Sequence, residues 1–255
     1  MSVTLAALGQ FGEGIDFIFN ERDSVGGDVK IGGPGEITEL GIEHLKVSFI
    51  ATTLAILIAS PIGLYLGHKG RGQFLASAVS NVGRAVPILV LIGLFIAYVG
   101  IGTTNVVFAL TLLAIPPILA NAYVGARQVD PEIVDAAEGM GMTGLQVVWR
   151  VRLPLALPTY LGGVRVGAVS VLATAAIAPL ANVQTLGEPI INQAIYGLDG
   201  AIGAAIVVAV LTVIADTLMA VFQSAMTPKG IKLERGEDSG GRRSISSLRR
   251  REQTT

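Results

Sequence analysis

The sequence predicts an all-α polytopic membrane protein with five transmembrane helices. Hydrophobic residues make up 51% of the 255 residues and charged residues only 15%, whereas roughly 25% is usual in a soluble domain. Long stretches carry no charge, and lysine and arginine collect beside several of them. A lipid bilayer is therefore the expected surrounding of most of the chain.

The uncharged stretches fix the number of expected spans. Residues 47–67 lie between Lys46 and His68 and are long enough for one crossing, which takes about 20 residues. Residues 85–126 suffice for two crossings, and glycines near their middle predict a turn there. Residues 166–187 and 202–222 supply two more, the last carrying only Asp216. The expected spans, which form a transmembrane domain over 47–227, are about 47–67, 75–99, 104–125, 161–182 and 201–224.

The basic residues predict the orientation. Cytoplasmic loops near spans are enriched in lysine and arginine. If the N-terminus lies outside and the C-terminus in the cytoplasm, only Arg22, Lys30 and Lys46 of the 18 basic residues are placed outside. We therefore expect residues 1–46 to form an extracellular or interfacial segment made of an interfacial helix and a flexible arm, and residues 228–255 to form a disordered cytoplasmic tail.

The segment 127–160 is the one long loop expected between spans, and long loops often carry a function. Asp130 is a good N-cap and Pro131 fits the first helical position, so a helix is expected to begin there and to end at Gly139 and Gly141. Ile133, Val134 and Ala137 give this first helix an apolar stripe.

A second short helix is expected to follow in the same loop. Thr143 and Gln146 have the spacing of a capping box, and Pro154 is expected to end the helix. Leu145, Val148 and Trp149 form an apolar face at helical spacing. An amphipathic helix pair of this kind is suited to the groove of a partner protein.

These residues also resemble a known family. Asp135, Ala136, Ala137, then Gly141 and the run from Val151 to Pro154 resemble the EAA loop of permeases in ATP-binding-cassette importers with the MetI-like fold. The spacing agrees at every position, with Asp135 in place of Glu and Val151 in place of Ile. Residues 129–158 look like the glycine betaine, carnitine and choline branch, whereas residues 179–187 lack the glycine-rich stretch usual in that branch.

The resemblance implies a role for the loop and a set of partners. The loop would be a cytoplasmic coupling element that docks into the cleft of an ATPase subunit. Its expected docking residues are Asp135, Ala136, Ala137, Gly141, Leu145, Trp149, Leu153 and Pro154. ATP and Mg²⁺ would be bound by the partner, and this chain would hold no cofactor and catalyse nothing. The implied partners in the cell membrane are an ATPase dimer, a second copy or a paralogous permease, and an extracellular solute-binding protein.

The expected cargo is a compatible solute such as glycine betaine, choline, carnitine or proline. An importer of methionine or another amino acid, a membrane scaffold without transport, and an ion-coupled secondary carrier remain alternatives. The carrier would require paired intramembrane charges or inverted repeats, and neither is apparent in the sequence. A soluble, DNA-binding helix-turn-helix is disfavoured because uncharged spans flank the loop, so no nucleic-acid partner is expected.

Polar residues within the spans are candidates for a translocation path because they are costly in lipid unless they face the bundle or water. Ser170, Thr174 and Asn182 are the candidates, with Gln184 beside them. Asp216 is expected to snorkel, to cap a helix or to pair with a basic residue. The absence of cysteine and the presence of only two histidines, His44 and His68, argue against a metal site.

Overall fold

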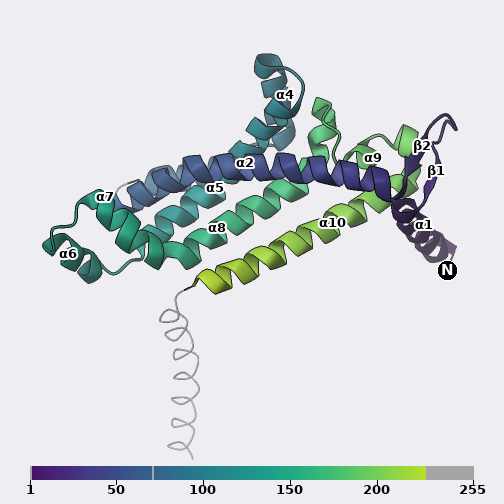
Figure 1. Ribbon diagram of the computed structural model, residues 1–255. Coiled ribbons are helices and arrows are strands. Elements are labelled where there is room, and N and C mark those ends of the chain that lie inside the picture. Colours follow the sequence, from purple (N-terminus) through teal and green to yellow (C-terminus); the bar gives the residue numbers. More distant parts are fainter. Residues whose placement is uncertain (1, 71, 228–255) are drawn as a thin grey trace, which may run out of the picture.

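The computed structural model describes residues 2–70 and 72–227 and confirms that this part of the chain is largely helical. In these residues four helical stretches are long and apolar enough to cross a membrane: Gly33–Lys69, Thr103–Arg127, Gly144–Ala181 and Gln193–Met226. They run roughly side by side, with the expected loop at one end of the bundle and the N-terminal elements at the other (Figure 1).

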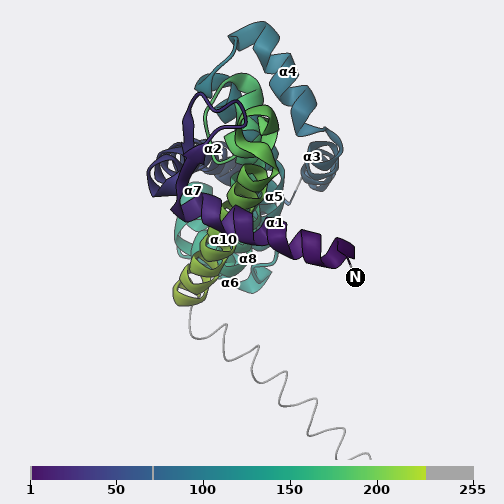
Figure 2. The ribbon, with the colours of Figure 1, turned by 90° about the vertical axis from the view of Figure 1, so that its right-hand side faces the viewer.

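The N-terminal segment contains the expected helix, but a hairpin takes the place of the flexible arm. Helix α1 (Ser2–Phe19) is followed by an antiparallel hairpin of β1 (Glu21–Asp23) and β2 (Lys30–Gly32), where a flexible arm was expected. α1 lies across α10 (Figure 2). A Cβ on Gly203 of α10 would lie 2.5 Å from the Gly14 carbonyl oxygen of α1, so the two backbones are in direct contact.

Helix α2 (Gly33–Lys69) includes the first expected span but begins much earlier. Pro34 lies in its first turn, and a Glu36 carboxylate oxygen accepts a hydrogen bond from the Gly32 backbone N–H at 2.5 Å. Both features favour a helix start. The helix ends at Gly70, which has φ of +63°, a left-handed conformation suited to glycine. The charge pattern therefore located the apolar part of this helix and missed its polar extension.

The region 75–99, expected as one span, is divided into α3 (Gln73–Ala85) and α4 (Ile88–Val99). Pro87 is the N-cap of α4 and adopts an extended conformation, with φ of −65° and ψ of 130°. Proline has no N–H to donate to the preceding turn and disfavours helical geometry in the residue before it. Helix α4, although apolar, is shorter than the other four stretches.

Helix α5 (Thr103–Arg127) forms the centre of the bundle and packs against both α2 and α8. Small residues allow this close approach. A Cβ on Gly63 of α2 would lie 2.7 Å from the Leu119 carbonyl oxygen, and one on Gly163 of α8 would lie 2.7 Å from the Pro117 carbonyl oxygen. The main core cluster accordingly draws on α2, α5 and α8.

The last part of the chain departs from the expected span boundaries. Helix α8 (Leu153–Thr174) begins before residue 161 and passes into a 3₁₀ helix, η2 (Ala175–Ala181). α9 (Glu188–Ile191) then leads into α10 (Gln193–Met226). Only 6% of the most apolar window of α10 is buried inside the chain, against 61% for α5. Residues 228–255, the expected disordered tail, lie outside the described residues.

Candidate functional site

The first half of the long loop forms helix α6 (Pro131–Gly139), as the sequence predicts. The Oδ1 atom of Asp130 accepts a hydrogen bond from the Glu132 backbone N–H at 2.9 Å, so the expected N-cap is confirmed. The chain then reverses at Gly141, which has φ of +83°. Residues that carry a side chain rarely adopt this backbone conformation, and glycine is therefore favoured at the turn.

The second half begins with α7 (Gly144–Val147) and its expected capping box. Thr143 Oγ1 accepts from the Gln146 N–H at 3.4 Å, and Gln146 Oε1 accepts from the Thr143 N–H at 2.8 Å. The expected end at Pro154 is wrong. The chain continues through a π-helical turn, η1 (Val148–Arg152), directly into α8, whose first turn holds Pro154. Because proline is tolerated in a first turn, it does not end the helix.

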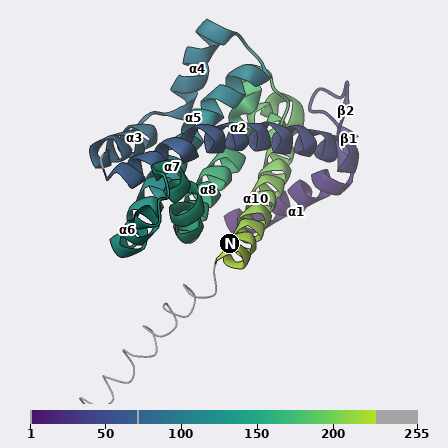
Figure 3. The same ribbon diagram turned by 60° about the vertical axis from the view of Figure 1, so that its left-hand side comes forward.

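The loop has a small hydrophobic core of its own. Val134 and Ala137 of α6 pack with Val147 of α7 and with Val129, and all four are at most 7% exposed. Burial of such apolar groups holds the two short helices together without help from a partner. The loop is therefore a folded unit at the end of the bundle, next to the end of α2 (Figure 3).

Most of the expected docking residues lie on the surface of this unit. Leu145 and Trp149 are 68% and 49% exposed. Asp135, Ala136, Gly141 and Pro154 are exposed as well. Ala137 instead belongs to the core of the loop, and Leu153 is partly buried against a small cluster containing Leu64 and Ala126. The expected set therefore divides into a surface and the packing residues beneath it. Met140, which was not in the expected set, is 77% exposed at the turn.

Arg152 connects the loop to two spans, α2 and α5. Its side chain is 7% exposed, and its Nε atom is 3.2 Å from Nδ1 of His68 at the end of α2. Its Nη1 atom donates to the carbonyl oxygen of Ala126 near the end of α5. A buried guanidinium with these partners connects η1, α2 and α5. From the sequence this arginine was one more basic loop residue, and nothing in its spacing indicated these contacts.

The three expected pathway residues do not form one site. Ser170 Oγ donates to the Val166 carbonyl oxygen of its own helix at 2.8 Å, and Thr174 is the last residue of α8. Asn182 is exposed beyond η2, with φ of +58°. It lines a groove of about 670 Å³ at the end of the bundle opposite the loop, together with Gln184, Thr103, Tyr196, Leu40, Ile42, Val183 and three glutamates of α2, Glu36, Glu39 and Glu43.

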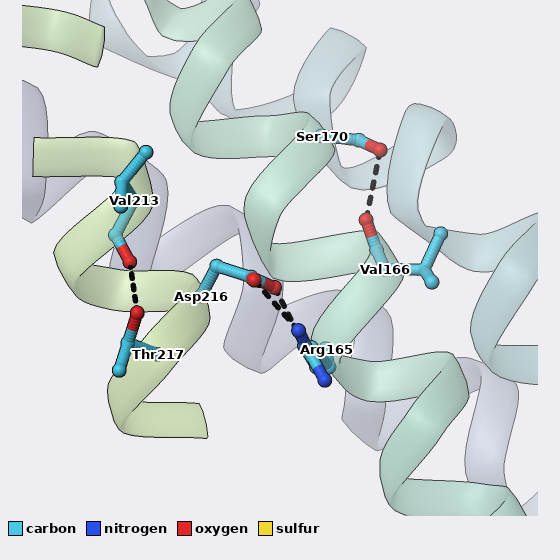
Figure 4. A network of polar contacts seen from close by, with 6 residues as sticks. All are labelled: Arg165, Val166, Ser170, Val213, Asp216 and Thr217. Atoms are coloured by element: carbon cyan, nitrogen blue, oxygen red, sulfur yellow. Dashed lines mark hydrogen bonds and ion pairs between the residues drawn. The ribbon is translucent and has the colours of Figure 1, made fainter. Parts of the chain in front are cut away.

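The structure also reveals a pair of charges within the helical bundle. Arg165 of α8 and Asp216 of α10 form two hydrogen bonds between their side chains (Figure 4). The expectation that Asp216 pairs with a basic residue is confirmed. No sign of this particular pair is visible in the sequence, because the partners are 51 positions apart and meet only when α8 packs against α10.

Comparison with known proteins agrees with the fold and identifies the family. A family model described as binding-protein-dependent transport system inner membrane component matches residues 51–228. The glycine betaine/carnitine/choline transport system permease protein OpuCB of Bacillus subtilis (strain 168) is 32% identical over 199 residues, covering 78% of this chain and 92% of that protein. The carnitine transport permease protein OpuCB of Listeria monocytogenes is 32% identical over 191 residues, covering 74% and 88%.

A solved structure shares the architecture. The inward-facing MetNI methionine ABC transporter gives a TM-score of 0.67 at 20% identity, over 76% of this chain and 98% of that chain. This likeness shows the fold alone. Together with the match over residues 51–228, it shows that the chain belongs to the family of binding-protein-dependent transport system inner membrane components, the permease subunits of ABC transporters with the MetI-like fold.

Proposed function

We propose that the unit formed by α6, α7 and η1 docks this permease onto an ATPase partner, whose ATP hydrolysis drives import of a small solute. The observation that carries the proposal is a loop with its own core that exposes Leu145, Trp149 and Met140. Exposed apolar and aromatic residues on a rigid element are suited to a partner's groove. In this proposal ATP and Mg²⁺ are bound by the partner, and this chain catalyses no reaction.

Movement of the docked loop would reach the spans through η1. Arg152 contacts α2 and α5, and Leu153 continues the same helical stretch into α8. Because one continuous stretch leads from α7 to α8, a displacement of α7 would be passed on as a displacement of the span. Ala137 would support this function by holding α6 onto α7.

The proposed solute is a compatible solute of the quaternary ammonium type, such as glycine betaine, choline or carnitine, with proline as a related candidate. Relatives at 32% identity are described as glycine betaine/carnitine/choline and carnitine permeases. Methionine or another amino acid is the alternative, since a methionine transporter shares the fold at 20% identity. The higher sequence identity favours the quaternary ammonium compounds.

The proposed assembly contains two permease subunits, an ATPase dimer and an extracellular solute-binding protein. α10 leaves most of its apolar surface uncovered within this chain, which a second permease copy or a paralogue would cover in part, and lipid elsewhere. In the orientation predicted from the basic residues, the loop faces the cytoplasm and the groove containing Asn182 faces the outside. A fifth span formed with α4, and a pathway along Ser170, Thr174 and Asn182, belong to the same proposal.

Uptake into vesicles tests the function. The permease is reconstituted with its ATPase and binding protein, and labelled glycine betaine, choline, carnitine and methionine are offered with internal ATP or a non-hydrolysable analogue. We expect uptake of at least one quaternary ammonium compound with ATP and none with the analogue. Uptake driven by an ion gradient without ATP would support the secondary carrier instead. Uptake of methionine alone would show that the solute is methionine and not a quaternary ammonium compound.

A further inference from the structure

A groove of about 520 Å³ lies between the end of α2 and the loop unit. Its walls are mainly apolar and aromatic. They are formed by Pro61, Ile62, Leu64, Tyr65 and Leu66 of α2 and by Gly144, Leu145, Val148 and Trp149 of α7 and η1, with His68 and Lys69 at one end. Leu145 and Trp149 also belong to the expected docking set, whereas the α2 wall of the groove belongs neither to that set nor to the expected pathway.

The groove lies where an apolar span gives way to polar chain. The uncharged part of α2 ends at His68 and Lys69, so the groove is at the level where the membrane meets water. Tyr65 and Trp149 are 54% and 49% exposed on its two walls. Tyrosine and tryptophan concentrate at this depth because their rings are apolar and their polar atoms can reach the interface.

The charged end of the groove is basic. The Lys69 ammonium lies 5.8 Å from the centre of the Tyr65 ring, so its charge is held over the aromatic wall. Among the described residues that line the groove there is no aspartate or glutamate. An apolar groove with a lysine at its polar end matches a molecule that has a hydrocarbon chain and an anionic head.

We propose that this groove binds one anionic phospholipid from the leaflet on the side of the loop. One acyl chain lies between Ile62 and Leu145, and the phosphate is held by Lys69. Burying the apolar walls against hydrocarbon removes them from water, at a gain that grows with the area covered. The positive charge selects an anionic headgroup over a zwitterionic one.

Such a lipid would touch a span and the docking loop at once. Gly144 of α7 faces His68 of α2, and a Cβ added to it would lie 3.1 Å from the His68 Nε2 atom. The groove therefore sits beside the point where α7 comes closest to α2. A bound acyl chain would fill the space between Tyr65 and Trp149 and fix the distance between the two elements.

The only tryptophan of the chain gives a direct measurement. The full-length protein is placed in phosphatidylcholine nanodiscs that contain a small fraction of a brominated lipid. In one set this lipid is phosphatidylglycerol, and in the other it is phosphatidylcholine; both carry bromine on their acyl chains. Bromine quenches tryptophan fluorescence at short range, so quenching reports a chain beside Trp149. We expect brominated phosphatidylglycerol to quench several-fold more strongly than brominated phosphatidylcholine at the same fraction.

Three variants separate the groove from general lipid exposure. Lys69→Gln should remove the preference for phosphatidylglycerol, and Ile62→Gln should weaken quenching by both lipids. Ile58→Gln is the matched control, because Ile58 lies one turn earlier on α2, is 45% exposed against 44% for Ile62, and does not line the groove. It should leave quenching unchanged.

Two results would overturn the proposal. Equal quenching by both lipids that is unchanged in Lys69→Gln would mean that Trp149 meets bulk lipid only. No quenching by either lipid would mean that protein covers the groove or that it lies outside the bilayer. Since solute uptake is not measured here, failure of this inference leaves the transport proposal standing, and failure of transport leaves the lipid result standing.

Discussion

Arg165 and Asp216 form an ion pair with two hydrogen bonds, and this pair joins α8 to α10. Arg165 Nε is 2.5 Å from Asp216 Oδ1, and Arg165 Nη2 is 2.6 Å from Asp216 Oδ2 (Figure 4). A second polar contact lies nearer the end of α10, where Gln223 Nε2 donates to the Pro158 carbonyl oxygen at 2.8 Å. Since α10 buries little apolar surface within the chain, these contacts are important for its position.

Asp216→Asn and Arg165→Gln should each loosen α10. Either change leaves the remaining charge part-buried without its partner, which is unfavourable. We expect a lower melting temperature in detergent and reduced uptake for both single variants, and partial recovery in the Arg165→Asp/Asp216→Arg exchange. Thr217→Val is the control, because within the described part of the chain the Thr217 side chain bonds only to Val213 of its own helix. Unchanged stability in both single variants would exclude this role for the pair.

Replacement of Gly67 by alanine should destabilise the α2–α5 contact. A Cβ at this position would lie 2.6 Å from the Tyr123 carbonyl oxygen, so backbone atoms must move. Overpacking of this kind costs about 1–3 kcal/mol. Thermal unfolding of the purified protein measures the change. Gly41→Ala, on the same helix, should keep or slightly raise the melting temperature, because no atom of the described residues lies within 4 Å of the added Cβ. A similar response in the two variants would contradict the close-packing argument.

Gly141→Asp should disrupt docking while membrane insertion remains intact. The residue has φ of +83° and lies exposed at the turn between α6 and α7, so a side chain strains the turn and adds charge to the surface. Co-purification with the ATPase should be lost. Gly139→Asp adds the same charge two residues earlier without a left-handed conformation, and should retain more binding. Normal assembly of the Gly141 variant would count against the docking role.

Arg152→Gln should uncouple the loop from the spans. The shorter side chain cannot keep contacts with both His68 and Ala126, and the lost hydrogen bond to a buried carbonyl costs about 1–3 kcal/mol. We expect the ATPase to remain bound but solute uptake to fall several-fold. Arg150→Gln, at an exposed position in the same turn, is the matched control. Equal effects of the two changes would show that general charge, and not the contacts of Arg152, is what the loop requires.

The orientation can be tested by labelling, because the natural chain contains no cysteine. Asp28→Cys in the exposed hairpin turn and Met140→Cys in the loop introduce one thiol each. A membrane-impermeant maleimide should label position 28 in intact cells and position 140 only after the cells are opened. The reverse pattern would place the loop outside, where it cannot meet a cytoplasmic ATPase.

Much of the loop was predictable because its signals are local. The Asp130 N-cap, the Thr143 capping box and the glycine turn depend on residues within a few positions of one another, and all three are observed. The apolar parts of the long helices were found for the same reason, since bilayer thickness sets a minimum length for an uncharged stretch. The break at Pro87 also has a local cause, but counting uncharged residues does not take proline into account.

The sequence by itself determined that the chain is helical and membrane-embedded, that its basic residues favour one orientation, and that one loop has the spacing of a docking element. Tertiary structure alone decided which residues of that loop are surface and which, like Ala137, are core. It alone brought Arg165 to Asp216 and Arg152 to His68. The reason is physical: helix formation and capping depend on near neighbours, whereas these contacts depend on how whole helices rotate and slide when their small residues pack.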